Sequence, residues 1–245
     1  AAFFVTLAAI HYQEKVMRVL QRVSVAITSL LLMVSVAAAA PLSAHQTVEQ
    51  TTDKVLSLID DANGYFESDP QRFYREIESI LDAVVDFDSF SRGVMGPYAT
   101  REYYKQLGSN KAKDAFKGQV RRFSGVFKQG LVQTYAKGLL AFGGTRTEVV
   151  PPAADDGSDG STTVLQKIYG SAEKPYEVHY KMRQDRDGSW KIRNVTIEAV
   201  NLGLVYQGQF ISAAKRYQGD LDKVIDNWSV KPAGQETAVQ PPSQQ

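Results

Sequence analysis

The spacing of the hydrophobic residues changes sharply at the pair Gly143-Gly144, and this change limits the possible folds more than any other feature. Before the pair, hydrophobic residues recur every three or four positions, which is the period of an amphipathic helix. After the pair they alternate with polar residues, as in antiparallel strands with one buried face. Helical spacing returns from Leu202 to Tyr217. This order predicts an α+β fold in which helices wrap a four-stranded antiparallel sheet.

The clearest helix is the segment 110–135, where Phe116, Val120, Phe123, Phe127 and Leu131 form one face. Its basic residues fall mainly on the remaining faces, as expected for an amphipathic helix. The same spacing predicts further helices over residues 47–66, 71–85, 202–217 and 220–228. Pro70 stands near the start of the second of these, where its missing N–H costs little.

Four strands are expected over residues 145–150, 161–170, 175–183 and 189–198. In the last strand, Trp190 and Ile192 have one parity, whereas Val195 and Ile197 have the other. This switch predicts a β-bulge near Arg193, which would bend the sheet. A curved sheet wrapped by helices has a concave face, and that face must be filled by side chains or by a ligand.

The stretch VDFDSFSRGVMGPY predicts a short helix with a defined start and stop. Asp86 is suited to cap a helix that begins at Phe87, and Gly96 followed by Pro97 is suited to end it. Asp86 and Asp88 could instead form a catalytic acid/base pair, but capping explains the pattern more simply. The hydrophobic edge of this helix would face either the core or a ligand.

The N-terminus has the three parts of a secretory signal over residues 17–44: a basic flank, the hydrophobic run 23–36 and small residues after it. Cleavage would fall within Ala37–Ala40 or after Ala44. A permanent membrane anchor is the alternative, although the hydrophobic run is short for a bilayer span. Residues 1–16 are interpreted as an upstream extension, 45–229 as the folded domain and 230–245 as a polar, disordered tail.

The residue types needed for several kinds of chemistry are missing. The chain has no cysteine, which excludes disulfides, thiolate metal sites and cysteine nucleophiles. Its three histidines are scattered, its net charge is +1, and no nucleotide-binding or hydrolase motif is present. We therefore expect no metal, no cofactor, no nucleic-acid partner and no enzymatic activity. Gly118, Gly125 and Gly130 inside the long helix, together with many aromatic residues, favour a hydrophobic pocket, although ordinary core packing would account for any single position.

Three stretches, VDFDSFSRGVMGPY, FKGQVRRFSGVFKQGLVQTYAKGLLAFGG and GSWKIRNVTIEAVNLGLVYQGQF, occur in an order that resembles the MlaC family of toluene-tolerance, or ABC-transporter auxiliary, proteins. The resemblance spans residues 47–228. It implies a nuclear-transport-factor-2-like fold with a deep apolar pocket. Asn194 and Ala199 depart from the family pattern, in which many members have Asp and Gly at these two places.

The resemblance also implies a function: a periplasmic carrier that moves diacyl phospholipids between the outer and inner membranes and so maintains outer-membrane lipid asymmetry. The implied partners are an MlaA-type lipoprotein–porin complex and an MlaD-type MCE subunit of an inner-membrane ABC transporter. A monomer is the simplest expectation for a carrier that meets two membranes.

Acyl chains are expected between the sheet and the long helix. The parity of the sheet that faces them is left open, so the candidate wall residues include both: Phe90, Val94, Met95, Tyr98, Phe116, Val120, Phe123, Phe127, Leu131, Tyr135, Val164, Tyr180, Met182, Trp190, Ile192, Val195, Ile197, Leu204 and Tyr206. Arg121 and Arg122 are candidates for contact with anionic partners or lipid head groups. The simpler alternative is that they belong to a solvent-exposed face of the helix.

Two other functions stay open. One is an isomerase or dehydratase on the same type of scaffold, which would need a buried acid or base such as Tyr180 with an aspartate. The other is a periplasmic adaptor or chaperone whose concave face is filled by its own core.

Overall fold

The computed structural model describes residues 41–141, 146–152, 157, 159–170 and 173–232. The expected upstream extension, most of the expected signal peptide and residues 233–245 of the expected tail lie outside this part of the chain. Among the helices within it, none is both long enough and apolar enough to cross a membrane.

The order of the elements confirms the α+β prediction. The helices are α2 (Ala44–Ala62), α3 (Pro70–Val84), α4 (Phe87–Met95), the 3-10 helix η1 (Gly96–Ala99), α5 (Arg101–Gln106), α6 (Asn110–Ala141), α7 (Leu202–Arg216) and α8 (Leu221–Asp226). The strands are β1 (Thr147–Val149), β2 (Ser161–Ile168), β3 (Tyr176–Gln184), β4 (Trp190–Ile197) and β5 (Val200–Asn201).

The strands form one antiparallel sheet in the order β1-β2-β3-β4-β5. The expected count of four strands was therefore one too low. Strand β5 has only two residues, which is too short to give an alternating pattern in the sequence. The long helix α6 also continues past its predicted end at Tyr135.

Helix α4 begins and ends as the sequence predicts. The Asp86 carboxylate accepts a hydrogen bond from the backbone N–H of Ser89 at 2.9 Å. Gly96, with a φ of +54°, ends the helix in a conformation that L side chains rarely adopt. The interpretation of Asp86 as a helix cap is confirmed.

The predicted β-bulge is present and Arg193 is its extra residue. Lys181 of β3 pairs with Asn194, whereas the next residue, Met182, pairs with Ile192. The Arg193 guanidinium lies 3.0 Å from an Asp86 carboxylate oxygen and 3.4 Å from one of Asp185. The bulge therefore joins the last long strand to the segment that begins α4.

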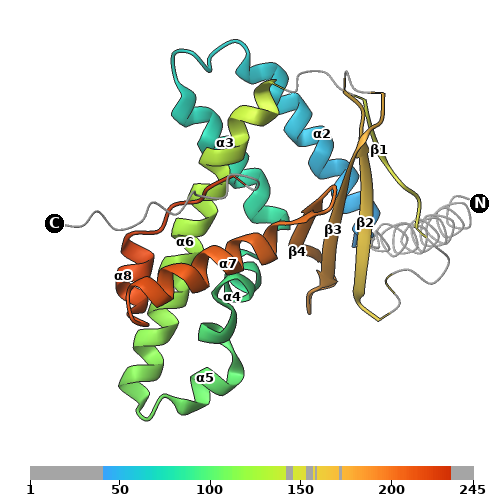
Figure 1. Cartoon of the computed structure of the whole chain (residues 1–245). Coiled ribbons are helices and arrows are strands. Elements are labelled where there is room, and N and C mark those ends of the chain that lie inside the picture. Colours follow the sequence, from blue (N-terminus) through green and yellow to red (C-terminus); the bar gives the residue numbers. More distant parts are fainter. Residues whose placement is uncertain (1–40, 142–145, 153–156, 158, 171–172, 233–245) are drawn as a thin grey trace, which may run out of the picture. The chain divides into compact units, whose positions relative to one another are not determined.

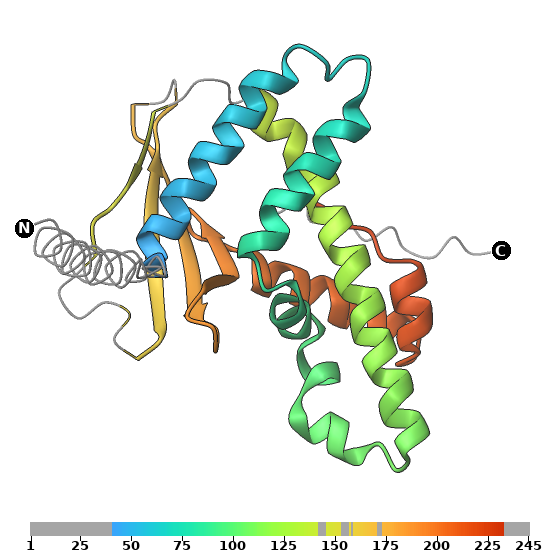
Figure 2. The same ribbon diagram turned by 180° about the vertical axis from the view of Figure 1, so that it is seen from behind.

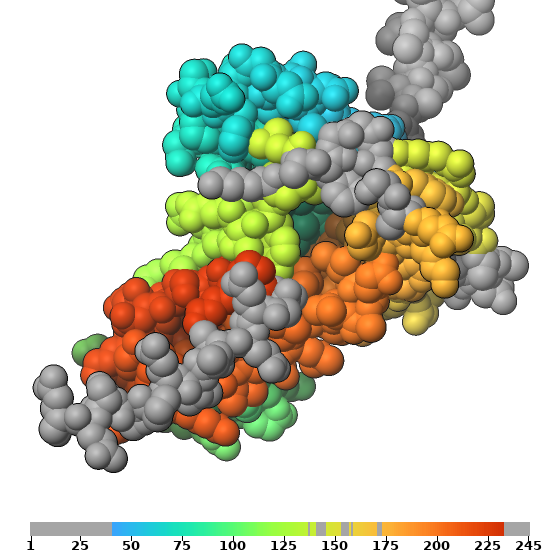
Figure 3. Space-filling model, turned by 45° about the horizontal axis from the view of Figure 1, so that its top comes forward, coloured from blue at the N-terminus to red at the C-terminus, as the bar shows by residue number. Residues whose placement is uncertain are grey.

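Helix α2 lies across one face of the sheet, whereas α6 packs with α3, α4, α7 and α8 farther from the strands (Figures 1 and 2). The helix that lies across the sheet is therefore α2, while α3, α4 and α7 contact β4. The sequence instead favoured the long helix as the element that faces the sheet. Around α6 the side chains form an aromatic core that includes Phe90, Phe123, Phe127, Tyr206 and Phe210. Figure 3 shows a hollow in the surface between α6 and the strands.

Candidate functional site

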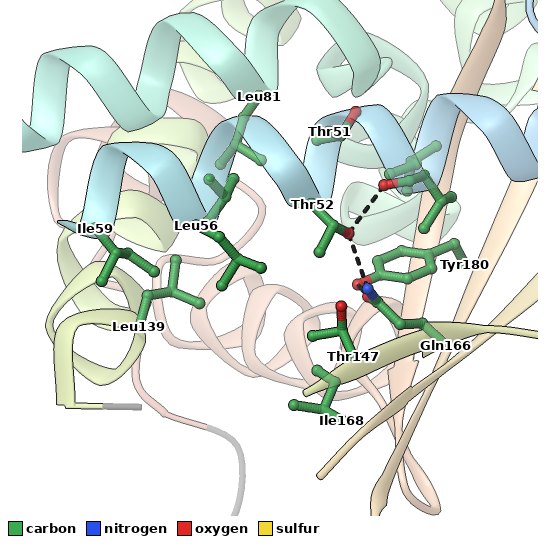
Figure 4. A pocket seen from close by; sticks show the side chains of 13 residues that line it. Thr51, Thr52, Leu56, Ile59, Leu81, Leu139, Thr147, Gln166, Ile168 and Tyr180 are labelled. Carbon is green, nitrogen blue, oxygen red and sulfur yellow. Dashed lines mark hydrogen bonds between the residues drawn. The ribbon is translucent and has the colours of Figure 1, made fainter. Parts of the chain in front are cut away.

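An apolar cavity of about 210 Å³ lies between α2 and the sheet (Figure 4). Most of one wall comes from α2, and the facing wall comes from β1 to β4. Leu81 of α3 and Leu139 of α6 complete the lining. The lining residues are Val48, Thr51, Thr52, Val55, Leu56, Ile59, Leu81, Leu139, Thr147, Gln166, Ile168, Tyr180 and Ile192.

The wall formed by α2 follows from the spacing of its residues. Val48, Thr52, Val55 and Ile59 recur at intervals of three and four, so they share one face of the helix. Two threonine hydroxyls on this wall donate to the helix's own carbonyls, Thr51 to Thr47 at 2.6 Å and Thr52 to Val48 at 2.9 Å. Because these hydroxyl protons are already used, the wall presents mainly hydrocarbon to a ligand.

One line of polar groups crosses the apolar cavity (Figure 4). The Gln166 side-chain amide, which is 2% exposed, donates to the Thr52 hydroxyl at 2.8 Å. The Tyr180 hydroxyl donates to the Gln166 carbonyl oxygen, also at 2.8 Å. We call these three residues the Thr52–Gln166–Tyr180 relay. It links α2 to β2 and β3 and leaves none of its side chains without a hydrogen bond.

The relay is suited to hydrogen bonding at neutral pH. Burial raises the pKa of Tyr180, because the phenolate would lose its hydration. The hydroxyl therefore stays protonated and continues to donate to Gln166. No other residue that lines the cavity has an ionisable side chain, so the cavity offers apolar contact and neutral hydrogen bonds.

The predicted wall residues are divided among the cavity, the core of the sheet, the aromatic core around α6 and the exposed surface. Tyr180 and Ile192 line the cavity. Val164, Met182, Trp190 and Ile192 form the core of the sheet together with Ala44 and Val48 of α2, and Tyr180 and Val195 pack against it. The aromatic core around α6 contains, or is in contact with, Phe90, Val94, Met95, Tyr98, Phe116, Val120, Phe123, Phe127, Leu131, Tyr135, Val195, Ile197 and Tyr206. Leu204 is 64% exposed. Contact of these residues with a ligand stays a prediction.

The sheet parity left open in the sequence is now defined. Gln166 of β2, Tyr180 of β3 and Ile192 of β4 all face the cavity. The α2 wall, by contrast, was not among the sequence candidates. Its signal was present as the regular stripe from Val48 to Ile59, but that stripe alone does not indicate whether the facing space is filled.

The glycines of α6 do not open the cavity, which corrects the argument made from the sequence. A Cβ atom added at Gly118 or Gly125 would meet no atom beyond its own helix within 4 Å. At Gly130 it would collide with Cγ2 of Val230. Gly130 therefore allows the segment after α8 to cross α6 closely.

The two arginines proposed for partner contact differ in their surroundings. Arg122 forms ion pairs with Asp222 at 3.0 Å and with Asp226 at 3.1 Å, which join α6 to α8. Arg121 instead lines a second hollow, which is formed by residues of α4, η1, α5 and α6. Within the described ranges, no group of three or more side chains could hold a metal ion.

Comparison with known proteins gives the family. The sequence model of the MlaC protein family matches residues 49–230. The chain belongs to the MlaC family. It is 34% identical over 197 residues to the toluene tolerance protein ttg2D of Pseudomonas putida, a match that covers 80% of this chain and 83% of that protein. Apart from Val48, every residue that lines the cavity falls within the range matched by the MlaC model.

A solved structure supports the fold of this MlaC-family chain. The phospholipid-binding protein of Ralstonia solanacearum, solved in complex with a phospholipid, superimposes with a TM-score of 0.61. The match covers 76% of this chain and 94% of the other, at 21% sequence identity. At this identity the likeness establishes the fold, an antiparallel sheet wrapped by helices.

Asn194, one of the two departures from the family pattern, lies outside the cavity. Its side-chain oxygen accepts from the backbone N–H of Gly203 at 3.0 Å, and its nitrogen donates to the Asn201 side chain at 2.8 Å. A Cβ atom at Gly203 would lie only 2.6 Å from the Asn194 oxygen. The contacts tie β4 to the start of α7, and a side chain at Gly203 would displace the Asn194 amide from them.

Proposed function

We propose that this chain is a periplasmic carrier that binds diacyl phospholipids and moves them between the outer and inner membranes, without chemical turnover. The observation that carries the proposal is the apolar cavity between α2 and the sheet. Membership of the MlaC family supports it, as does a protein of the same fold that was solved with a phospholipid. The basic, hydrophobic and small-residue parts of segment 17–44 support export to the periplasm.

The physical task of such a carrier is to replace water around hydrocarbon. Each buried methylene contributes about 0.8 kcal/mol. Transfer of a lipid with roughly thirty methylenes from a membrane into water therefore costs upwards of ~20 kcal/mol. Only a cavity that restores most of this apolar contact makes the lipid soluble. The mainly hydrocarbon lining of the α2–sheet cavity is suited to this.

The cavity must enlarge to hold a whole lipid. Its 210 Å³ corresponds to about seven groups the size of a water molecule, which is enough for part of one acyl chain. The inference is that loading separates α2 from the sheet. The relay spans that same interface, so its Thr52–Gln166 hydrogen bond would break or rearrange as the cavity opens.

The proposed exchange partners are an MlaA-type lipoprotein–porin complex at the outer membrane and an MlaD-type MCE subunit of an inner-membrane ABC transporter. In this scheme the carrier takes lipid from one partner and delivers it to the other. This transport maintains the lipid asymmetry of the outer membrane. Family membership is the support for these partners.

The experiment is extraction of the exported, purified protein with organic solvent, followed by mass spectrometry of the extract. We expect diacyl phospholipid in near-stoichiometric amount. Val55→Trp places a large ring in the cavity and should lower the copurified lipid at least tenfold. Val200→Trp is the matched control, because Val200 is 39% exposed and does not line the cavity.

An empty wild-type protein would favour an adaptor without ligand. A loaded wild type together with an equally loaded Val55→Trp variant would show that lipid binds elsewhere. Thermal unfolding of both tryptophan variants checks that any loss of lipid does not come from loss of the fold.

A further inference from the structure

A second hollow, of about 460 Å³, lies between α4, the segment from η1 to α5, and the first half of α6. Its lining residues are Asp88, Arg92, Ala99, Thr100, Arg101, Tyr104, Phe116, Lys117, Val120 and Arg121. None of them lines the α2–sheet cavity. Along α6, Arg121 and the cavity residue Leu139 are separated by roughly 27 Å at 1.5 Å per residue. The hollow is therefore a separate feature of the surface.

Positive charge is concentrated in this hollow. Four basic side chains, Arg92, Arg101, Lys117 and Arg121, face one acidic side chain, Asp88, which leaves a local excess of three positive charges. The whole chain carries a net charge of only +1. The local excess is thus not a reflection of overall composition, and mutual repulsion among these cations would be relieved by a bound anion.

Most of these cations have no partner in the protein. Lys117 forms an ion pair with Asp114 at 3.0 Å. In the part of the chain that the structure describes, Arg92, Arg101 and Arg121 make neither an ion pair nor a side-chain hydrogen bond. The neighbouring Arg122 is different, because Asp222 and Asp226 occupy its guanidinium. Three guanidinium groups around one concavity therefore keep their donors free.

The shape and chemistry of the hollow point to one class of anion. Arginine presents a planar fork of N–H donors that matches two oxygens of a phosphate at once. Tyr104, Phe116 and Val120 add ring and aliphatic surface to the lining, which suits the organic part of a phosphate ester. The volume lies within the range of about 300–1,000 Å³ that is usual for small-ligand sites.

We propose that this hollow binds a phosphate group, the anion shared by phospholipid head groups and soluble phosphate. Arg92, Arg101 and Arg121 would supply the donors, and Asp88 would disfavour the most highly charged anions. The site does not depend on the proposed lipid cargo, because it shares no residue with the cavity.

The test compares two double variants with the same change in charge. Arg92→Gln/Arg121→Gln removes two of the free guanidinium groups, whereas Arg183→Gln/Arg186→Gln removes two exposed arginines elsewhere. Inorganic phosphate is titrated at constant ionic strength and followed by backbone amide NMR shifts. We expect saturable shifts around residues 88–121, with an affinity about tenfold weaker for each hollow arginine removed. The control variant should bind as the wild type does.

A second arm uses vesicles of phosphatidylcholine with and without phosphatidylglycerol, in the Val55→Trp background so that the cavity cannot take up lipid. Binding of phosphate alone identifies a soluble anion as the ligand, and binding of anionic vesicles identifies a lipid head group. Equal losses in the two double variants, or shifts that do not saturate, would overturn the proposal. The copurified lipid of wild type and Val55→Trp is measured without changing any of these arginines, so a failure here is distinguishable from failure of the carrier proposal.

Discussion

The two sides of the molecule use hydrophobic residues in opposite ways. Around α6 the core is built from rings in direct contact: the centroids of Phe123 and Phe210 lie 4.8 Å apart, and those of Phe127 and Tyr206 lie 5.3 Å apart. Between α2 and the sheet most of the facing side chains are valine, threonine, leucine and isoleucine, with one ring, that of Tyr180, and the amide of Gln166, and about 210 Å³ stays open. The contrast teaches that the size of the side chains, more than their hydrophobicity, decides which layer is filled and which is hollow.

Removing a ring from the aromatic core should give the largest effect. Phe123 is fully buried and contacts Phe127, Phe210 and Trp228. Phe123→Ala should lower the free energy of unfolding by about 3–5 kcal/mol, because it removes buried surface and leaves a void. Urea unfolding followed by circular dichroism measures the change.

The comparison variant is Leu56→Ala in the cavity wall, where the space is already open and the side chain is only half-buried. Its expected cost is about 1 kcal/mol, near the centre of the range for point substitutions. Equal losses for Phe123→Ala and Leu56→Ala would contradict the distinction between a filled and a hollow layer.

A smaller effect is expected from the relay that crosses the cavity. Gln166→Met keeps the length of the side chain but leaves the Tyr180 hydroxyl without its acceptor, which should cost about 1–3 kcal/mol. Tyr180→Phe should cost less, because it deletes the donor itself. The double variant should lose less than the sum of the two single losses, since both act on one hydrogen bond. Strict additivity in urea unfolding would show that the two groups are not coupled.

The smallest effect concerns the start of α2. Ser43 accepts from the backbone N–H of Gln46 at 3.1 Å, and the Gln46 side chain accepts from the Ser43 N–H at 2.9 Å. Ser43→Ala should cost about 1 kcal/mol, as expected for a helix cap. Glu49→Ala, an exposed change on the same helix, is the control for thermal unfolding. Because cleavage after Ala44 would delete this cap, mass spectrometry of the exported protein should find an N-terminus before Ser43.

Features set by neighbouring residues were predictable from the sequence. Asp86 and Gly96 marked both ends of α4, and the parity switch after Ile192 marked the bulge at Arg193. Such signals depend on local backbone geometry, so they can be interpreted without knowledge of the fold. The two-residue strand β5 carried no comparable signal.

The position of the cavity was not predictable in the same way. Both α2 and α6 have a hydrophobic stripe, and the sequence does not specify which stripe faces the sheet. The bulky residues of α6 drew attention to that helix, but rings such as Phe127 fill the space that they face. Small residues such as Val55 and Thr51 leave room for a ligand because they fill less.

The Asp86 carboxylate has a role beyond beginning a helix. One oxygen accepts from the N–H of Ser89 and the other pairs with the guanidinium of Arg193, so this side chain is one of the links between the curved sheet and the aromatic half of the protein. If the proposed loading displaces β4, this contact would transmit the displacement to the start of α4. Loading of the interior would then be reported on the outside of the molecule through one aspartate.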